Sequence, residues 1–408
     1  MNNRTALASV IAVVFVDLLG FSIVLPLMPF YASRFQASDT TIGLLVASYA
    51  VAQFFATPIL GQLSDRYGRR PVLILSVLGS LLGFVMWAFA EPLGGLCLPG
   101  LEPHNAALTV LLASRVLDGF SGGNISVAQA YISDVTTPER RSAGMGMIGA
   151  AFGLGFILGP PLGGWLSSDG DFARPALVSA TLAGLNLMAI VFFLKESRQG
   201  IKPITKRSAF PVAAILDGLR RPQVGLLLWV SFFYFLAFST FTSIFSLYTL
   251  RRFQLSPRDN GFLLGFVGMV IVVTQVTLVG RFTRRFGEPN LVRYGIPTLA
   301  LAMLGWGMVP NLTALLAVLV LIPMTAGMLN VSLRSSMSRV GDPGEVGTLM
   351  GVQASVESLT RAIGPILGAL LMDHFGPGAP GIFAFITLAG LALVVGPKVK
   401  RLPDSSVV

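Results

Sequence analysis

The chain has little of what soluble enzymes use for chemistry. Its 408 residues include one cysteine, Cys97, which excludes an intrachain disulfide, and two histidines, His104 and His374, which leave little for a metal site. Charged residues make up 12% of the chain, about half the share of roughly 25% that is usual in soluble domains. Hydrophobic residues make up 53%, and the mean hydropathy is +0.75. This composition excludes a water-soluble enzyme and a disordered chain.

The apolar residues fall into runs of about 20, the length that a membrane helix needs. Six runs come before a basic stretch at 195–222 and six come after it. The predicted spans are 6–31, 42–63, 71–90, 107–131, 143–166, 175–194, 223–248, 260–280, 292–309, 313–333, 347–371 and 380–397. We therefore predict an all-α integral membrane protein with twelve transmembrane helices in two pseudo-symmetric six-helix bundles. The bundles are 1–194 and 223–408, joined by a basic cytoplasmic linker at 195–222, and the second ends in a short cytoplasmic tail.

The basic residues predict the orientation. Most of the 29 Lys and Arg residues lie in the loops of one side, and these loops are cytoplasmic if the positive-inside rule holds. Arg334, directly after the span 313–333, is counted among them. Both termini are then cytoplasmic. The net charge of +10 reflects this orientation and contact with anionic lipid, so we expect no nucleic-acid partner.

Two sequence patterns recur in the two halves. Gly61-Gln-Leu-Ser-Asp-Arg-Tyr-Gly68 follows the second span, and Gly280-Arg-Phe-Thr-Arg-Arg-Phe-Gly287 follows the eighth. Gly159-Pro160 in span five matches Gly364-Pro365 in span eleven. Recurrence at equivalent places indicates a duplicated six-helix unit, the kind of repeat on which secondary transporters are built. The alternative is that such turns recur in any membrane protein of many spans.

Asp17 is the most unusual residue of the first span. It lies about 16 Å from the inner end of that helix, and no basic residue lies one helical turn away. A charge in lipid costs on the order of 3 kcal/mol, so this carboxyl needs a partner on another helix or must be protonated. A carboxyl that changes its protonation state suits proton coupling and substrate contact. A structural carboxyl that binds a neighbouring helix is the alternative.

Further polar residues lie in the predicted spans. In span eleven, Glu357 and Arg361 are spaced i, i+4, so they either line a substrate cavity or neutralise one another. In span four, Arg115 is within pairing reach of Asp118, and it either biases the protonation of a nearby carboxylate or anchors the helix. The remaining candidates for a cavity are two amides and one aromatic ring, Asn124, Gln275 and Phe238. The phenylalanines of span seven bind a lipophilic or cationic compound or face lipid.

The glycine-rich stretch 149–164 has small residues at four-residue spacing, as in close helix packing. It lies inside an apolar span with no preceding strand, so a dinucleotide site is rejected. The chain also has no G-x-x-x-x-G-K-[ST] phosphate loop, which argues against an ATP-driven pump.

Several of these motifs resemble one family. Gly61-Gln-Leu-Ser-Asp65-Arg66-Tyr-Gly68-Arg69-Arg70 is similar to the loop 2–3 signature of the major facilitator superfamily. The stretch from Asp17 to Pro29, Arg115-Val-Leu-Asp118-Gly119 and the span-five glycines resemble motifs of its twelve-span drug:proton antiporters, which include the tetracycline exporters.

The resemblance implies roles for these residues. Asp65, Arg66 and Arg69 would latch the two halves on the cytoplasmic side, with Asp134 paired to the arginines, and Arg115 would act in proton relay. The latch motif also contains Gly61, Gly68 and Arg70. The packing motif, which would form the interface with the second half, comprises Gly149, Gly153, Gly159, Pro160, Gly163 and Gly164. In the second half Arg284 replaces Asp65, so a weaker latch is expected there. Spans three and nine contain no acidic residue, which argues against tetracycline as the substrate.

The resulting prediction is a secondary active transporter, a proton-coupled drug efflux antiporter that works by alternating access. Its energy source would be the proton gradient, with no cofactor and no metal. Its partners would be a small lipophilic or cationic substrate, protons and the lipid bilayer, and it would act as a monomer in the cell inner membrane. The alternatives are a carrier of a sugar, peptide or lysolipid by symport or uniport, and a membrane receptor without transport. An enzyme is not predicted, because Ser, His and Cys are not arranged for nucleophilic catalysis.

Overall fold

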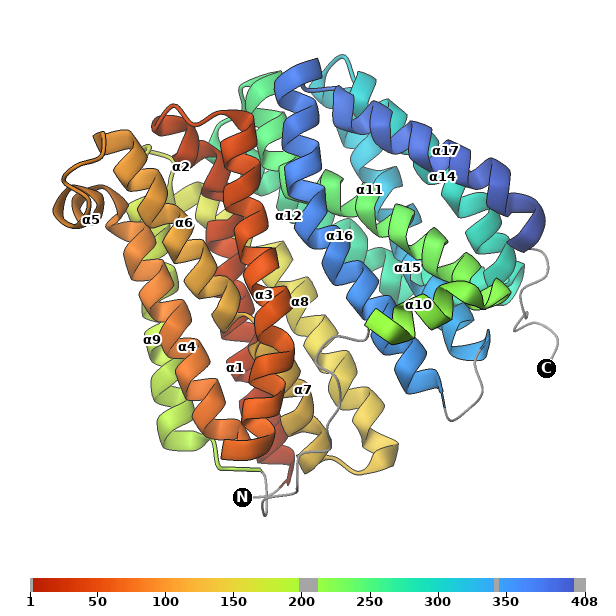
Figure 1. The fold of residues 1–408 in the computed structure, drawn as a ribbon, viewed down its shortest axis with the longest axis horizontal. Helices are drawn as coiled ribbons and strands as arrows, with labels where there is room; N and C mark the ends of the chain where they lie inside the picture. Colours follow the sequence, from red (N-terminus) through yellow and green to blue (C-terminus); the bar gives the residue numbers. More distant parts are fainter. Residues whose placement is uncertain (1–2, 198–211, 341–344, 400–408) are drawn as a thin grey trace. The chain divides into compact units, whose positions relative to one another are not determined.

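The computed structural model describes residues 3–197, 212–340 and 345–399 (Figure 1). These residues form helices and turns, and no strand occurs among them. Most of the predicted linker 195–222, namely 198–211, and the tail from 400 onward lie outside the described residues. The chain divides into two compact units, which are described separately below.

The first unit holds the described residues of 1–209 together with 254–268. Its helices, coloured red to yellow-green in Figure 1, are α1 (Asn3–Val24), η1 (Leu25–Leu27), α2 (Met28–Arg34), α3 (Asp39–Tyr67), α4 (Arg69–Ala88), α5 (Ala90–Cys97), α6 (Pro103–Ser121), α7 (Asn124–Val135), α8 (Pro138–Leu166) and α9 (Ala173–Phe193). The first turns of α12 (Pro257–Val273) also belong to this unit, although we predicted the whole segment 260–280 as part of the second bundle.

Local sequence explains where several of these helices begin and end. Ser38 caps α3, because its Oγ accepts the backbone N–H of Thr41 at 3.1 Å. Gly68 ends α3 with a φ of +100°, a conformation that few residues other than glycine adopt. The predicted span 107–131 is broken into α6 and α7 at Gly122 and Gly123. A Cβ on either glycine would lie about 3 Å or less from atoms of α3. Glycine at both positions therefore lets the junction of α6 and α7 pack closely against α3.

The second unit holds the described residues of 210–253 and 269–408. Its elements are α10 (Val212–Arg220), α11 (Pro222–Phe253), the π-helical segment η2 (Thr274–Leu278), α13 (Val279–Phe286), α14 (Glu288–Met308), α15 (Leu312–Val340), α16 (Val346–Phe375) and α17 (Ala379–Val399). Gly287, with a φ of +73°, separates α13 from α14 just as Gly68 separates α3 from α4.

The same helix pairings occur in both units. In the first unit α1 packs along α8, and α4 packs along α9. In the second unit the equivalent spans pair likewise, α11 with α16 and α14 with α17. This correspondence agrees with the predicted duplication and confirms the fold class of two pseudo-symmetric helical bundles.

Each predicted span is helical in the structure, as the bounds above show. By length and composition, eight helical segments of the described residues can cross a membrane. The pair α16 and α17, bent by 119°, passes that test jointly and would count as a ninth if it were one span. Two predicted spans do not pass the test among the described residues: the one that is broken into α6 and α7, and the one that forms α14.

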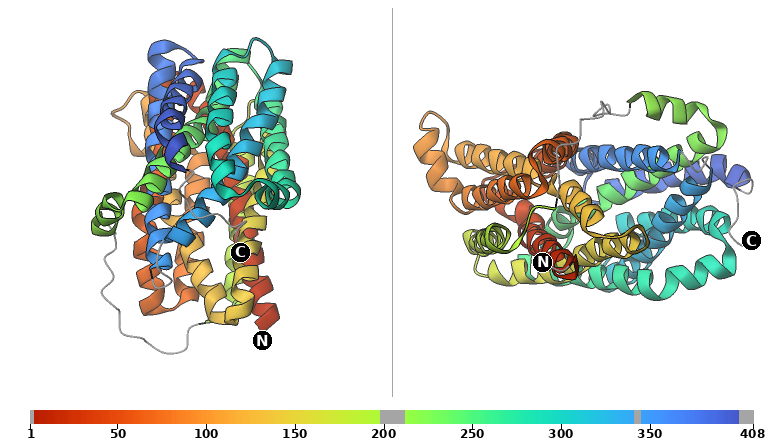
Figure 2. Two further views of the ribbon diagram at one scale, coloured as in Figure 1. Left: turned by 90° about the vertical axis from the view of Figure 1, so that its right-hand side faces the viewer. Right: turned by 90° about the horizontal axis from the view of Figure 1, so that it is seen from below.

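Two short helices lie where we predicted loops. α5 lies almost entirely between the predicted spans 71–90 and 107–131, and α10 lies within the linker 195–222. Figure 2 shows α10 turning directly into α11. At this turn Arg221 binds Asp217 at 3.0 Å and Glu345, directly before α16, at 2.6 Å. α10 is therefore tied to the second unit by ion pairs as well as by its contacts with α11 and α16.

Candidate functional site

Asp17 has a partner on another helix. Its half-buried side chain lies in α1, and the side-chain amide of Asn124, the first residue of α7, donates a hydrogen bond to its Oδ2 at 3.0 Å. An amide N–H can donate to a carboxylate and also to the carbonyl oxygen of a protonated carboxyl. The contact therefore holds Asp17 in place in either protonation state. The two candidates Asp17 and Asn124 are thus brought together.

Arg115 and Asp118 form a buried ion pair within α6. The exposed fractions of their side chains are 1% and 4%, and Nη1 of Arg115 lies 3.1 Å from Oδ2 of Asp118. The guanidinium also lies 4.8 Å from the ring centre of Trp87 on α4. Its Nε and Nη2 have no hydrogen-bond partner among the described residues. The carboxylate beside Arg115 is therefore Asp118, which serves as its counter-ion.

Glu357 holds two arginines in the second unit. Its Oε1 accepts a hydrogen bond from Arg361 at 2.6 Å, one turn along α16, as their spacing predicts. Its Oε2 accepts one from Arg334 of α15 at 2.5 Å. Our placement of Arg334 in a cytoplasmic loop is wrong, because α15 continues to Val340. The apolar run ends before Arg334, so hydropathy alone put the end of the helix too early.

The aromatic candidate Phe238 belongs to the second unit as well. It is half-buried on α11 and stacks on the ring of Tyr234, with ring centroids 6.2 Å apart. The Tyr234 hydroxyl donates to the backbone oxygen of Ala326 on α15 at 2.8 Å, so the ring of Tyr234 lies against that helix. Gln275 is different. Its side chain is exposed in the π-helical segment η2, and no described interaction connects it to Glu357.

The predicted latch residues form a network within the first unit. Arg69, the first residue of α4, binds Oδ1 of Asp65 at 2.8 Å and Oδ2 of Asp134 at 3.1 Å. It also donates to Ser64 Oγ at 2.7 Å. Arg69 thus joins the ends of α3, α4 and α7. Arg66 is exposed, and its guanidinium carbon lies 5.2 Å from the ring centre of Tyr67.

Glu196 is a part of this network that sequence reasoning missed. Its two carboxylate oxygens accept the backbone N–H groups of Arg69 at 2.9 Å and of Arg70 at 3.0 Å, at the N-terminus of α4. A carboxylate is favoured there, because the first N–H groups of a helix have no partner within it. A Cβ on Gly68 would lie 2.5 Å from Glu196, so the motif glycine makes room for the carboxylate. The sequence offered one indication of this role, because Glu196 is an acidic residue within the basic linker 195–222. A Cβ on Gly61 of the same motif would lie 3.9 Å from Oγ of Ser126, which is an ordinary contact, so this position has room for a side chain.

The second unit has a counterpart with the charges exchanged. Glu288 follows Gly287 as Arg69 follows Gly68, and its buried Oε1 accepts from Arg339 at 3.1 Å and from Ser335 at 2.7 Å. Arg284, at the position of Asp65, donates to a backbone oxygen of its own helix. An acidic residue at the start of α14 and a basic residue on α15 thus replace Arg69 and Asp134. The expectation of a weaker latch considered Arg284 alone and overlooked this pair.

The span-five glycines pack α8 against two helices of the first unit. A Cβ on Gly159 or Gly163 would collide with Ser22 or Ile23 of α1. On another side of α8, a Cβ on Gly164 would collide with Pro257 at the start of α12. Pro160 lies close to α12 as well, since its backbone oxygen is the nearest atom to a Cβ built on Gly261. Gly149 has nothing within 4 Å of such a Cβ, and Gly153 is half-buried. Close approach of the helices therefore does not require a glycine at position 149.

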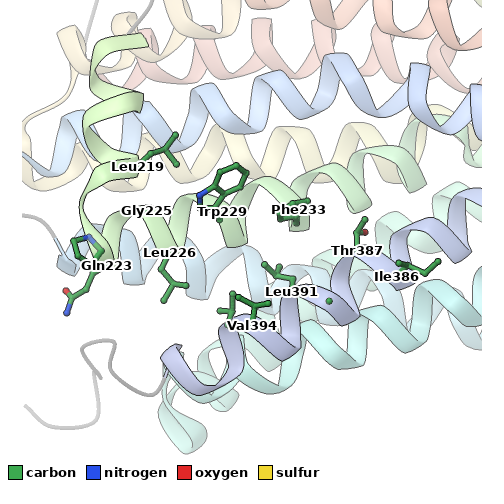
Figure 3. A pocket seen from close by; sticks show the side chains of 13 residues that line it. Leu219, Gln223, Gly225, Leu226, Trp229, Phe233, Ile386, Thr387, Leu391 and Val394 are labelled. Atoms are coloured by element: carbon green, nitrogen blue, oxygen red, sulfur yellow. The ribbon is translucent and has the colours of Figure 1, made fainter.

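An apolar groove of about 900 Å³ lies between α11 and α17 (Figure 3). Trp229 and Phe233 line it from α11, and Leu391 and Val394 line it from α17. Phe233 is one of the span-seven phenylalanines that we considered for drug binding, whereas Phe241 of the same helix is buried. The groove lacks charged side chains, so it suits an acyl chain or another apolar group.

Comparison with known proteins agrees with this geometry. The family model described as Major Facilitator Superfamily matches residues 10–365. The chain belongs to this superfamily. It is 30% identical to tetracycline resistance protein, class C, of Escherichia coli, over 98% of each chain. It is 28% identical to multidrug resistance protein 2 of Bacillus subtilis (strain 168), over 98% of this chain and 96% of that one.

Solved structures give the same result. The human organic anion transporter MFSD10 (TETRAN) matches with a TM-score of 0.67 and 27% identity, covering 97% of this chain and 100% of that one. A D-xylose-proton symporter matches with a TM-score of 0.73 and 16% identity, which supports the fold alone. The predicted resemblance to the superfamily and to its tetracycline-resistance members is confirmed, and the chain is a membrane transporter of this superfamily.

Proposed function

We propose that this transporter exports small amphipathic, drug-like molecules in exchange for protons. The observation that carries the proposal is the Asp17–Asn124 contact, a half-buried carboxyl in the middle of a membrane helix whose partner is neutral. No cationic side chain of the described residues pairs with Asp17, so the carboxyl can take up and release a proton without breaking an ion pair among them. The names of the bacterial relatives, tetracycline resistance protein and multidrug resistance protein, favour drug export.

In the proposed cycle Asp17 is protonated from outside and deprotonated towards the cytoplasm, and substrate leaves when the proton arrives. Arg115 acts on this cycle through Asp118. The network of Arg69 stabilises one state of the cytoplasmic side, and the glycines of α8 allow its close packing on α1. We propose that the protein resides in the cell inner membrane with both termini cytoplasmic, needs no cofactor and works as a monomer. The positive-inside distribution of Lys and Arg supports this orientation.

A metabolite carrier is the second candidate. The relatives named above include an organic anion transporter as well as drug-resistance proteins. The two arginines around Glu357 favour a substrate with a negative group, which some metabolites carry and a cationic drug does not. This candidate concerns the cargo and leaves the role of Asp17 unchanged.

Everted membrane vesicles with an acid interior, followed with a pH-sensitive dye, test the proposal. We expect some compounds of an amphipathic panel to dissipate the gradient in wild-type vesicles and not in vesicles with Asp17→Asn. Asp169→Asn is the matched control, because Asp169 is an exposed aspartate outside the predicted spans. If Asp17→Asn exchanges protons for substrate at the wild-type rate, Asp17 has no part in coupling. If no compound acts although the protein is folded, proton antiport is wrong for this panel, and uniport or symport takes its place.

A further inference from the structure

Three charged side chains lie together inside two membrane helices of the second unit. Arg361 is fifteen residues from the start of α16 at Val346 and fourteen from its end at Phe375, so it lies about 20 Å from either end. Arg334 lies six residues before the end of α15, about 9 Å from it. At the depth of Arg361 a guanidinium cannot reach the headgroups, so it must contact protein, water or a ligand.

The cluster has more positive than negative charge. Each oxygen of Glu357 is occupied by one arginine, and the carboxylate has an exposed fraction of 13%. The two arginine side chains are 40% and 57% exposed. No other Asp or Glu occurs on α11, α15 or α16 except Asp373 near the far end of α16. Among the described residues Glu357 is the only acidic partner of the two arginines, so the cluster has one more positive than negative charge.

The arginines also have hydrogen-bond donors to spare. A guanidinium has five N–H donors. Among the described residues, Arg334 uses Nη2 for Glu357 and Nε for Oδ1 of Asn330 at 3.0 Å. Arg361 uses only Nη2, for Glu357. The remaining N–H groups of the two arginines have no acceptor among the described residues, so they can bind an added acceptor.

We infer that Arg334 and Arg361, both paired with Glu357, bind the anionic group of a small organic substrate, a carboxylate or a sulfonate on an amphipathic molecule. Planar guanidinium groups suit such oxyanions, because two N–H donors can point at two oxygens. The ring of Phe238, stacked on Tyr234, provides an apolar surface on the neighbouring helix for the rest of the molecule. This site disagrees with the cationic substrate that the aromatic residues of span seven suggested.

This inference rests on the proposed transport of small molecules, and it is tested by binding, without a gradient. The purified protein in neutral detergent is titrated calorimetrically with three ligands that share the naphthalene ring and differ in charge, 2-naphthoate, 2-naphthylmethanol and 2-naphthylmethylammonium. We expect naphthoate to bind at least tenfold more tightly than the other two. Arg361→Gln and Arg334→Gln should each weaken naphthoate at least tenfold. Arg281→Gln, which removes an exposed arginine of α13, should leave it unchanged.

The variant Glu357→Gln distinguishes ligand binding by the two arginines from a purely structural role of the cluster. It raises the charge of the cluster by one, so naphthoate should bind more tightly, opposite to the effect of the arginine variants. A structural role for the cluster would weaken binding in all three variants, and this result would overturn the inference. Equal affinity for the three ligands would also overturn it. So would displacement of naphthoate by phosphatidylglycerol at equal concentration, because the site would then hold a lipid headgroup.

The two proposals fail separately. A protein that binds naphthoate as expected but moves no protons in vesicles retains the anion site and loses the antiport mechanism. A protein that exchanges protons for cationic compounds, with Arg361→Gln fully active, retains antiport and loses the anion site.

Discussion

Removing one partner of the buried pair of Arg115 and Asp118 should cost more stability than breaking any of the exposed ion pairs described here. Asp118→Asn keeps the size of the side chain and an oxygen that can accept from Nη1, but removes the negative charge. Breaking a buried pair by changing one partner costs about 3 to 5 kcal/mol, because the other charge is left uncompensated. The arginine already has two unpartnered nitrogens, so no other group of the described residues replaces Asp118.

Because the guanidinium of Arg115 also contacts the ring of Trp87, we expect the loss of stability to lie in the lower part of that range. A cation–π contact contributes about 0.5 to 2 kcal/mol, and it persists in the variant. We therefore expect Asp118→Asn to lower the free energy of unfolding by about 3 kcal/mol. The measurement is an SDS titration in mixed micelles, followed by tryptophan fluorescence and by circular dichroism. Asp169→Asn breaks an exposed pair and should cost less than about 1 kcal/mol.

A double variant completes the test. Arg115→Met with Asp118→Leu replaces both charges by apolar side chains, and such replacements are often neutral or stabilising. It should return to within about 1 kcal/mol of the wild type. A loss below about 0.5 kcal/mol for Asp118→Asn would refute the reasoning, because the guanidinium would then be hydrated or neutralised by another group. A double variant as unstable as the single one would show that side-chain shape, and not charge, determines stability here.

Three further predictions concern other parts of the chain. Glu196→Ala removes the acceptor of two N–H groups at the start of α4, and the same titration should show a loss of about 1 to 2 kcal/mol; an unchanged value would mean that water caps the helix equally well. Gly163→Ala should cost about 1 to 3 kcal/mol because its Cβ meets the backbone of α1, whereas Gly149→Ala should cost nothing measurable, and equal effects would contradict the packing described. Hydrogen bonds from Arg221 lower the pKa of Glu345 below its usual range. Its stabilisation is therefore present above the pKa of an unfolded glutamate and is lost as the pH falls through the lower pKa of the folded state. The melting temperatures of the wild type and Glu345→Gln should accordingly differ at pH 7 and converge in acid; a difference that persists below pH 3 would contradict this.

Hydropathy and local motifs were sufficient for the architecture. Each predicted span is helical, because a membrane helix must be apolar over a length set by the bilayer, and this is a property of consecutive residues. The motif Gly68-Arg69-Arg70 likewise marked the break between α3 and α4 correctly, since a positive φ needs glycine at one position. The ends were less certain where an apolar run stops before the helix does, as at Arg334.

The partners of the charged residues were decided by tertiary structure. Asp17 binds Asn124 across 107 positions of sequence, and Arg69 binds Glu196 through its backbone across 127. These contacts depend on which face each helix turns toward its neighbour. In a membrane that rotation has a weak signature in sequence, because lipid and protein interior are both apolar and the side chains facing them are alike. The sequence by itself thus determined the spans and the family, and its spacing predicted the pairs within α6 and α16. Only the packing of the helices decided that Asn124 is the partner of Asp17 and that Arg334 joins Arg361 at Glu357.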